Sequence, residues 1–468
     1  MSTFIRSTPP AAEWLRPSEL DDPYFAHGAG KILLGQRKDG RKIGVADNRH
    51  IVTIAGSRAG KSATSLMPNL LEWRGSVLAI DPKGELATNT AKHRADMGQN
   101  VVILDPFGEV KGEAAQYRKR FDPLSEIKAG SEVDIIDNAA LIADSLIVPA
   151  EGNKNDHWSL SAKNIVRGFI LWALAQEAKG KGTASLNQMR EWLTMPLEND
   201  DDDKPDMMDM FSDMMEDDAF DGVVSGVGGT MYGKPDGERG SVISTAVEQT
   251  AFLDSSPMRD HFSGSDLTTL RALKRQPTTI YLVLPASRMA THFRWFRMVI
   301  TLAMSALESE PSNQPDPVLF ILEEFPQLGY MRQLEAAAGL MAGYDVKIWA
   351  VIQDLSQIRA LYKDSWETFV GNAGIIEAFG NTDATTLEYL SKKIGMTLSR
   401  QVQPDNPSLQ AQQGGARPER ETVVTVPLLA THELALQFAR ENNNKLVMIA
   451  GRPPFVLRRV FWKDMISG

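Results

Sequence analysis

The amino-acid sequence predicts an α/β fold with a mostly parallel sheet and an inserted all-α domain. Apolar, strand-like runs alternate with helix-like segments over residues 50–106 and again from residue 278. Continuous apolar runs are typical of parallel strands that helices cover on both faces. Between residues 150 and 265 the apolar residues recur at helical spacing instead. We therefore expect residues 1–149 and 266–468 to form the two parts of the α/β domain, with an N-terminal hairpin in the first, and residues 150–265 to form the inserted domain.

Composition excludes several classes of protein and of site. The chain has 468 residues, of which 43% are hydrophobic and 24% are charged, as in an ordinary soluble globular protein. It contains no cysteine, which excludes disulfides and thiolate metal sites. Its seven histidines show no metal-ligand spacing, so we expect no structural zinc. The net charge of −10 does not favour indiscriminate binding to nucleic acid, but it leaves a local binding channel open.

The sequence contains no segment that resembles a membrane span or a secretory signal. Its apolar runs are far shorter than the roughly 20 residues that a spanning helix needs. The N-terminus also lacks an apolar signal region. We therefore expect a cytoplasmic protein.

In the first part of the chain we expect a hairpin, followed by strands and helices in alternation. The hairpin joins residues 31–36 to residues 41–46 through the turn signal Asp39-Gly40. The strands that follow are residues 50–54, 76–81 and 100–106. The helices are residues 61–73 and a polar helix that ends at about residue 97.

In the inserted segment we expect helices over residues 156–176, 186–193 and 241–252, with the glycine-rich residues 222–240 as a connector. Residues 401–419 are rich in Pro, Gln and Gly and are expected to form a mobile loop. A long helix is expected over residues 291–307. The later strands are expected at residues 278–285, 318–322, 347–353, 375–379, 423–426, 446–450 and 455–461.

A phosphate-binding loop is the most specific signal in the sequence. Residues 55–62 read A-G-S-R-A-G-K-S between a strand-like run and a helix start, which is the context that such a loop requires. Small residues let backbone N–H groups converge on phosphate oxygens, and the helix N-terminus adds positive charge. Ala55, the smallest substitute, replaces the first glycine of the usual pattern. We therefore expect the chain to bind a nucleoside triphosphate.

The loop residues have expected roles. Lys61 would reach the β- and γ-phosphates, and the hydroxyl of Ser62 would hold Mg²⁺. The residues expected to contact the nucleotide are Gly56, Ser57, Arg58, Ala59, Gly60, Lys61, Ser62 and Ala63.

Hydrolysis also needs groups that orient the metal ion and a water molecule. The apolar run of residues 317–322 ends in Glu323 and Glu324, and ligands of parallel sheets lie at the carboxyl ends of the strands. These acids are therefore expected beside the loop. Successive strand residues point to opposite faces, so we assign Glu323 to the Mg²⁺ shell, through a bridging water, and Glu324 to the attacking water.

Two further polar residues end predicted strands. Gln353 is expected to sense the γ-phosphate and to join Lys61 and the two glutamates as a catalytic residue, although a surface glutamine without a role is the alternative. Asp81 would either support the metal or cap the helix that begins there, and the sequence does not decide between these two roles.

The motifs resemble those of the coupling-protein ATPases of type IV secretion and conjugation. They run in order over nearly the whole chain, from about residue 30 to residue 465. Besides the loop, the most specific matches are M-P-N-L-L at residues 67–71, D-P-K-G-E-L at 81–86, F-D-P-L at 121–124, H-W at 157–158, L-E-E-F-P at 322–326, I-Q-D-L-S-Q at 352–357, F-G-N-T-D at 379–383 and G-R-P-P at 451–454.

The resemblance implies a RecA-like P-loop NTPase fold and a homo-hexameric ATPase that uses ATP and Mg²⁺. Such a protein would recruit DNA, or a relaxase bound to DNA, and translocate it to a type IV secretion or conjugation channel. Any DNA contact is expected to be with the backbone and independent of sequence. Two alternatives remain open: an ATP-switched receptor for protein substrates, and a soluble DNA-dependent ATPase of mobile-element maintenance or defence.

Two features of the family are missing or unplaced. Members usually begin with transmembrane helices, which this sequence lacks. A separate membrane or secretion-channel protein would then dock the chain, peripherally, at the inner membrane. Ring ATPases of this kind also take an arginine finger from the adjacent subunit, and Arg332 and Arg359 are the candidates.

Two kinds of charged segment allow a functional and a structural interpretation. The acidic, Met-rich residues 200–220 would offer adaptable contacts to basic export signals, or would form a solvated loop and an amphipathic helix. Basic clusters would contact phosphate backbones or simply face solvent. These clusters are Arg37-Lys38, Arg41-Lys42, Arg118-Lys119-Arg120 and Lys392-Lys393.

Overall fold

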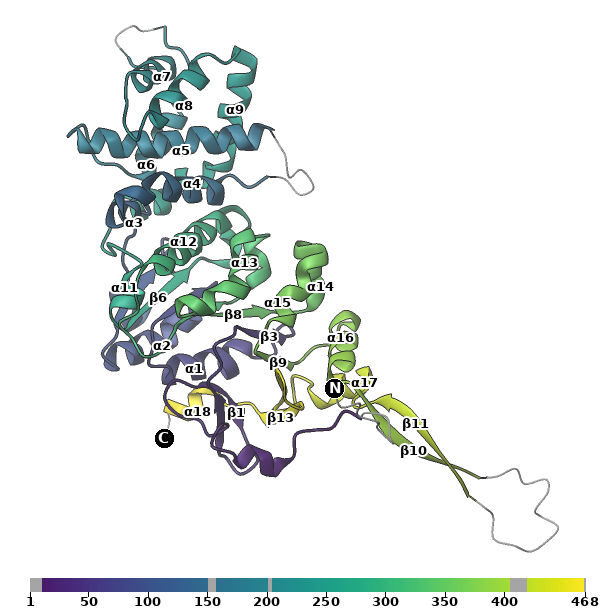
Figure 1. Ribbon diagram of the computed structural model, residues 1–468. Coiled ribbons are helices and arrows are strands. Elements are labelled where there is room, and N and C mark those ends of the chain that lie inside the picture. Colours follow the sequence, from purple (N-terminus) through teal and green to yellow (C-terminus); the bar gives the residue numbers. More distant parts are fainter. Residues whose placement is uncertain (1–10, 150–156, 201–203, 405–418, 467–468) are drawn as a thin grey trace, which may run out of the picture. The chain divides into compact units, whose positions relative to one another are not determined.

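The computed structural model describes residues 11–149, 157–200, 204–404 and 419–466. The chain divides into two compact units, both drawn in Figure 1. The first unit combines Met1–Trp73 with Trp349–Gly468, and the second unit is Arg74–Ile348. This division does not test the domain limits expected at residues 149 and 265, which stay a prediction.

The first unit contains a mixed sheet. In its centre β3 (Ile51–Ala55) lies parallel to β8 (Val346–Ile352) and to β9 (Ile375–Phe379). Every residue of these three strands is buried, as their apolar sequences predict. The other neighbours in the order β2-β1-β13-β12-β9-β3-β8 are antiparallel. These outer strands are β1 (Ile32–Gln36), β2 (Lys42–Val45), β12 (Asn444–Ile449) and β13 (Phe455–Arg458).

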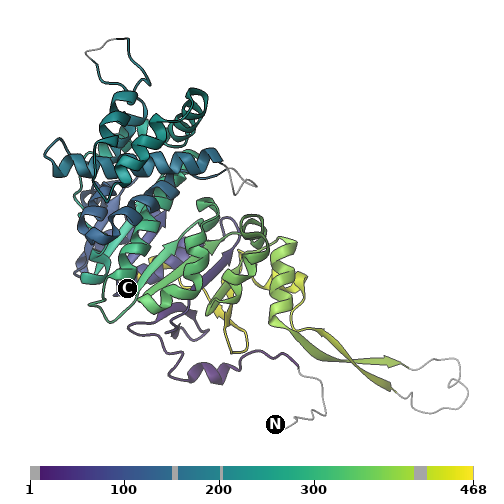
Figure 2. The ribbon, with the colours of Figure 1, turned by 45° about the horizontal axis from the view of Figure 1, so that its top comes forward.

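A two-stranded ribbon projects from the first unit in both views (Figures 1 and 2). It consists of β10 (Met396–Pro404) and β11 (Glu419–Pro427), paired antiparallel with Leu398 opposite Thr425. The expectation of a loop over residues 401–419 was therefore wrong at both ends, and β10 was not predicted. Residues 396–401 of β10 are half-buried or exposed, so cross-strand pairing with β11 and not burial holds this strand in place. Residues 405–418 lie outside the described residues.

Helices and helical turns complete the first unit. They are η1 (Pro17–Asp21), η2 (Ser62–Leu66), α1 (Met67–Glu72), α14 (Leu355–Tyr362), η9 (Lys363–Ser365), α15 (Trp366–Gly371), α16 (Ala384–Ile394), α17 (Thr431–Gln437) and α18 (Trp462–Ile466).

The second unit contains parallel strands in the order β7-β4-β6-β5. These are β4 (Val77–Asp81), β5 (Asn100–Leu104), β6 (Thr278–Val283) and β7 (Val318–Leu322). All residues of β4, β6 and β7 are buried. The continuous apolar runs thus form a parallel sheet buried on both faces, which confirms the expected α/β class.

Helices and helical turns make up the rest of the second unit. Helices α5 to α9 lie on the far side of α4 from the strands of this unit, and we call α5 to α9 the helical layer (Figure 1). The helices are α2 (Glu85–Asp96), α3 (Leu124–Ala129), α4 (Ile135–Leu146), α5 (His157–Ala178), α6 (Leu186–Leu193), α7 (Met207–Met215), α8 (Val223–Tyr232), α9 (Asp236–Gln249), α10 (Ser256–His261), α11 (Ala272–Arg275), α12 (Met289–Ser309) and α13 (Arg332–Leu340). The shorter turns are η3 (Gly112–Tyr117), η4 (Glu132–Asp134), η5 (Ala251–Asp254), η6 (Ala286–Arg288), η7 (Phe325–Leu328) and η8 (Met341–Tyr344).

The glycine-rich segment expected to be a connector is helical, so that expectation was wrong. Residues 222–240 contain all of α8 and the start of α9. The glycines of α8 serve packing: a Cβ on Gly228 would lie 2.8 Å from Met214 Cβ, on the neighbouring helix α7. A Cβ on Gly168 of α5 would lie 2.5 Å from Val227 Cγ1 of α8. Close helix contacts outweigh the low helix propensity of glycine here.

The Met-rich segment forms an amphipathic helix, which is part of the structural interpretation given above. Asp206 caps α7 by accepting from the N–H of Asp209 at 2.9 Å. Met207, Met210 and Met214 are buried in the helical layer. The amphipathic spacing of this helix therefore reflects core packing. Residues 201–203 of the acidic run lie outside the described residues.

A hydrogen-bonded neck joins the helical layer to the rest of the second unit. We give this name to residues 120–126, where the chain leaves the strands, and residues 265–271, where it returns. The carbonyl of Arg120 accepts from the N–H of Asp266 at 2.9 Å, and the Asp266 carboxylate accepts from the Arg120 N–H at 2.9 Å. Ser265 Oγ lies 2.8 Å from Ser125 Oγ. The two crossing segments are thus held side by side.

Candidate functional site

The loop after β3 has the backbone geometry of an anion-binding site. Arg58 (φ 56°) and Gly60 (φ 87°) lie in the left-handed region, and Lys61 (φ −52°) follows in the right-handed region. Such alternation aims neighbouring N–H groups at one point and forms a concavity for an anion. The helix then begins with a π-helical turn, η2, a rare form that is common at functional sites.

The loop is closed by its own hydrogen bonds. The N–H of Ala59 donates to Gly56 O at 3.1 Å. Thr64 donates to Gly60 O through both its N–H, at 2.9 Å, and its hydroxyl, at 2.8 Å. Lys61, Ser62 and Ala63 are half-buried at the start of the helix, where an anion is favoured, while Ser57 and Arg58 are exposed.

Two glycines bring the loop against the end of β9. A Cβ on Gly56 would lie 1.9 Å from Gly380 O, and a Cβ on Gly380 would lie 2.6 Å from Ala59 Cβ. The N–H of Gly56 also donates to Phe379 O at 3.3 Å. The loop can therefore take this position only without side chains at Gly56 and Gly380. The sequence analysis did not identify Gly380 as a site residue, although it too follows an apolar strand, as the loop does.

Ala55 fits its position because its methyl group is part of a small apolar cluster with Ala59 and Phe379. Arg459 closes this cluster from one side: its guanidinium lies 5.1 Å from the centre of the Phe379 ring. Its Nη1 donates to Ala59 O at 2.6 Å. The alanine that departs from the usual loop pattern thus packs against the residues that anchor the loop. Arg459 was missed because no local pattern relates it to the loop.

A buried polar network connects residues that precede the loop in the sequence with residues that follow it. Glu377 of β9 accepts from Thr53 Oγ1 of β3 at 3.2 Å and from Ser65 Oγ of η2 at 3.0 Å. Lys445 of β12 donates to the other carboxylate oxygen at 2.7 Å, and both charged side chains are fully buried. Trp349 completes the network by donating to Thr53 Oγ1 at 2.8 Å.

This network fixes the strand that enters the loop and the helix that leaves it. Burial lowers the pKa of Lys445, and the carboxylate of Glu377 opposes that effect. Charged residues inside the apolar runs I-I-E-A-F and N-K-L-V-M-I were the available signal for such a pair. The sequence analysis did not use it.

Gln353 lies at the carboxyl edge of the strand next to β3. The register pairs Ile54 with Ile352, so Gln353 follows at the level of Ala55. Its carbonyl accepts from Asn381 Nδ2 at 3.1 Å. Gln353 therefore lies beside the start of the loop, and its sensing role stays a prediction.

The acids Glu323 and Glu324 follow β7 in the second unit. Leu322 is paired with Ile80, so Glu323 lies at the level of Asp81 on the neighbouring strand, at the carboxyl edge of this parallel sheet. Glu323 is buried, and Glu324 is half-buried with a left-handed backbone (φ 56°, ψ 40°). Because the loop and the acids belong to different units, the expectation that they lie side by side stays a prediction.

Asp81 is a capping residue, one of the two roles that the sequence left open. Its Oδ2 accepts from the N–H of Ala87 at 2.8 Å, in the first turn of α2. Burial raises the pKa of Asp81 to about 6, although the backbone donors at the start of α2 oppose that shift. These bonds stabilise the helix start.

The residues at hand fit the groups that the motif implies. A nucleotide phosphate suits the loop because the left-handed residues Arg58 and Gly60 give its backbone the form of an anion-binding concavity. Mg²⁺ prefers oxygen ligands, and the Ser62 hydroxyl at the end of the loop is one such group.

Several cations of the basic clusters are paired within the chain. Arg37 and Arg41 pair with Asp21, while Arg118 and Arg120 pair with Asp105 and Asp266. Lys42 pairs with Glu72. These contacts favour the structural interpretation of the clusters, since exposed ion pairs of this kind partly neutralise them.

Comparisons with known proteins give one consistent result. The family described as "Type IV secretory system Conjugative DNA transfer" matches residues 11–466. A conjugal transfer protein TraG of Escherichia coli is 27% identical over 381 residues, which cover 77% of this chain and 58% of that protein. The protein VirD4 of Agrobacterium fabrum is 24% identical over 470 residues, which cover 95% of this chain and 62% of that protein. The chain thus spans about three fifths of the length of these relatives.

Solved structures show the same fold. The bacterial conjugative coupling protein TrwB, in an unbound form, superposes with a TM-score of 0.68 at 15% identity, covering 97% of this chain and 95% of that one. TrwB in complex with ADP and Mg²⁺ superposes with a TM-score of 0.66 at 14% identity, with the same coverage. The RecA-like α/β fold with a helical domain is therefore confirmed.

Proposed function

The chain belongs to the type IV secretory system conjugative DNA transfer family, and from this premise we propose that it is an ATP-hydrolysing coupling protein. It recruits DNA, or a relaxase bound to DNA, and moves the DNA to a secretion or conjugation channel. The observation that carries the proposal is the family match over residues 11–466 together with a loop curved around an anion site.

In this proposal the first unit binds the nucleotide. Gly56 to Ala63 would surround the phosphates, and Lys61 would contact the β- and γ-phosphates. The Ser62 hydroxyl would hold Mg²⁺, and Glu323 would belong to the Mg²⁺ shell through a bridging water. Bound Mg²⁺ would neutralise charge on the phosphates. The solved complex of TrwB with ADP and Mg²⁺ supports this assignment.

Glu324 orients and activates the attacking water, and Gln353 responds to the γ-phosphate. An arginine finger would come from a neighbouring subunit of a homo-hexamer. Its candidates are Arg332, exposed at the start of α13, and Arg359, which lies 5.5 Å from the centre of the Trp366 ring.

The partners follow from the same family. DNA would contact the protein through its backbone without regard to sequence, and the helical layer would receive the relaxase or another secreted protein. No helix within the described ranges of the chain is long and apolar enough to cross a membrane. The proposal also includes a membrane or channel protein that holds the chain at the inner membrane.

The test is ATP turnover at low, stated salt, with and without single- and double-stranded DNA. We expect stimulation by DNA that decreases as salt is raised, because contacts to phosphates release counterions. Lys61→Ala should abolish turnover by weakening nucleotide binding, while Glu324→Gln should leave ATP bound and lower turnover to a small residual rate. Gly240→Ala, an open helical position of α9, is the matched control and should behave as the parent.

Turnover that ignores DNA but responds to a basic secreted protein would instead favour the ATP-switched protein receptor. DNA-stimulated turnover without recruitment to membranes in cells that carry the secretion genes would favour a role in mobile-element maintenance or defence. Absence of turnover under every condition would contradict the proposal.

A further inference from the structure

The turn that carries Glu324 has an unusual backbone at both ends. Glu324 itself is left-handed (φ 56°, ψ 40°), as is Gly329 (φ 68°), and the short helix η7 lies between them. A left-handed residue other than glycine is uncommon, and such strain persists only where the surroundings enforce it. The turn therefore needs an external support.

Arg297 of α12 provides that support. Its Nη1 donates to Leu328 O at 2.7 Å and to Tyr330 O at 2.8 Å. These carbonyls lie on the two sides of Gly329, so one guanidinium holds the end of the turn. The side chain is only 7% exposed. Charge-assisted hydrogen bonds of this kind, shielded from water, are among the stronger polar contacts in a protein.

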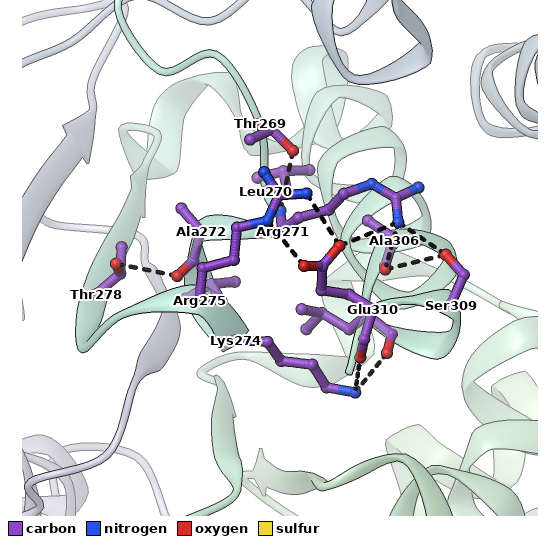
Figure 3. Close-up of polar contacts among 12 residues, drawn as sticks. Thr269, Leu270, Arg271, Ala272, Lys274, Arg275, Thr278, Ala306, Ser309 and Glu310 are labelled. Atoms are coloured by element: carbon purple, nitrogen blue, oxygen red, sulfur yellow. Dashed lines mark hydrogen bonds and ion pairs between the residues drawn. The ribbon is translucent and has the colours of Figure 1, made fainter. Parts of the chain in front are cut away.

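Helix α12 is itself fixed at its C-terminal end, as Figure 3 shows. Lys274 donates to Leu307 O at 2.6 Å and to Glu310 O at 2.8 Å, and Arg271 donates to Ser309 Oγ at 2.8 Å. The two bonds from Lys274 satisfy carbonyls that a helix end otherwise leaves without a partner. Ser305 Oγ also donates to Asn138 Oδ1 of α4 at 3.1 Å. Arg297 thus projects from a helix that is tied to the neck and to the helical layer.

We propose that Arg297 is a positioning residue for Glu324. By fixing the turn from Glu324 to Tyr330, it holds the Glu324 carboxylate where that group can orient the attacking water. The inference rests on the proposed function, because it needs Glu324 to act in ATP hydrolysis. It adds a residue that neither the loop motif nor the acidic motif contains.

The test compares Arg297→Met, which keeps the length of the side chain but removes its donors, with Arg297→Lys and with Arg294→Met. Arg294 is the matched control, since it lies on the same helix and contacts Gln249, not the turn. We expect Arg297→Met to lower kcat by about 10- to 100-fold, because small misplacement of a catalytic group has effects of this size. The Kd for ATP should change by less than about twofold, since the phosphate-binding loop is untouched.

Two further readouts separate positioning from simple loss of stability. Amide exchange at Gln327 and Gly329, whose N–H groups bond within the turn, should accelerate in Arg297→Met and not in Arg294→Met. If Arg297 acts through Glu324, the double variant Arg297→Met/Glu324→Gln should be no slower than Glu324→Gln alone. Arg297→Lys should recover part of kcat by restoring one donor.

The inference is overturned if Arg297→Met keeps the kcat of the parent, if its exchange is unchanged, or if the two substitutions multiply. It is also overturned if the loss of kcat merely follows the loss of folded protein, measured as nucleotide-binding sites per chain. A parent chain without any turnover would instead contradict the proposed function, and the positioning role with it.

Discussion

At the scale of single residues, two glycines determine how closely the phosphate-binding loop approaches the end of β9. Gly56 and Gly380 each face a backbone or side-chain atom at a distance that a Cβ cannot occupy. Ala55, the position at which the loop departs from its usual pattern, lies instead in a cluster that accepts a methyl group. The usual pattern has its first glycine at position 55, but in this loop it is Gly56 that has no room for a Cβ.

Gly56→Ala tests this demand. Its Cβ would meet Gly380 O at 1.9 Å, a backbone atom that cannot move aside by rotation of a side chain. We expect strain of about 1–3 kcal/mol, the usual cost of overpacking, and a loss of ATP affinity of about tenfold or more as the loop shifts to relieve it. Titration with a fluorescent ATP analogue and a thermal melt measure the two effects. Unchanged affinity would show that the loop tolerates the shift.

The sequence predicts part of this candidate site, and there is a physical reason why the other residues could not be predicted from it. Lys61 and Ser62 belong to a short contiguous motif, so their neighbours along the chain were enough to predict roles for them. Arg459, Glu377 and Arg297 act through contacts with segments far away in the sequence, and only folding brings those segments together. A charged residue inside an apolar strand, such as Glu377, is the only local sign in the sequence that such a distant contact exists.

At the scale of elements, α8 shows that packing against neighbouring helices can outweigh the low helix propensity of glycine. Three glycines in ten residues predicted a connector, yet the segment is a helix. Its small residues let α5 and α7 approach closely, and the buried contact outweighs the lower helix propensity. Helices with regular apolar spacing, such as α6, were predicted with their observed ends, because that signal is entirely local.

A pair of substitutions in α8 separates packing from propensity. A Cβ on Gly228 would lie 2.8 Å from Met214 Cβ and 2.8 Å from Phe211 O, whereas a Cβ on Gly226 would meet nothing. We expect Gly228→Ala to lower the free energy of unfolding by about 1–3 kcal/mol, and Gly226→Ala to raise it by about 0.5–1 kcal/mol. Urea unfolding followed by circular dichroism measures both. Equal effects from the two alanines would contradict the packing explanation.

At the scale of the whole molecule, the neck is where the helical layer meets the strands of the second unit. Asp122 lies there just before α3, and its carboxylate accepts from the N–H of Leu124 at 3.0 Å. Burial raises the pKa of Asp122 to about 7, although the backbone donor opposes that shift. The folded state therefore keeps a proton on this carboxyl at a pH where the unfolded chain has lost it.

This raised pKa predicts how stability depends on pH. Between the two pKa values the folded state binds more protons, so stability falls as pH rises toward 7 and levels off above it. From about pH 6 to about pH 8 we expect this group to lower the free energy of unfolding by about 1 kcal/mol relative to Asp122→Asn, which lacks the titrating group. Thermal melts of parent and variant across this range measure the difference. The exposed Asp96→Asn is the control, and parallel pH profiles for parent and Asp122→Asn would contradict the prediction.

The neck also has an evolutionary consequence. Because the outgoing and returning segments are bonded to each other, with Arg120 O and Asp266 N 2.9 Å apart, everything between them is a cassette whose ends meet. Recombination could exchange such a cassette for another helical module without altering the strand order of the parallel sheet.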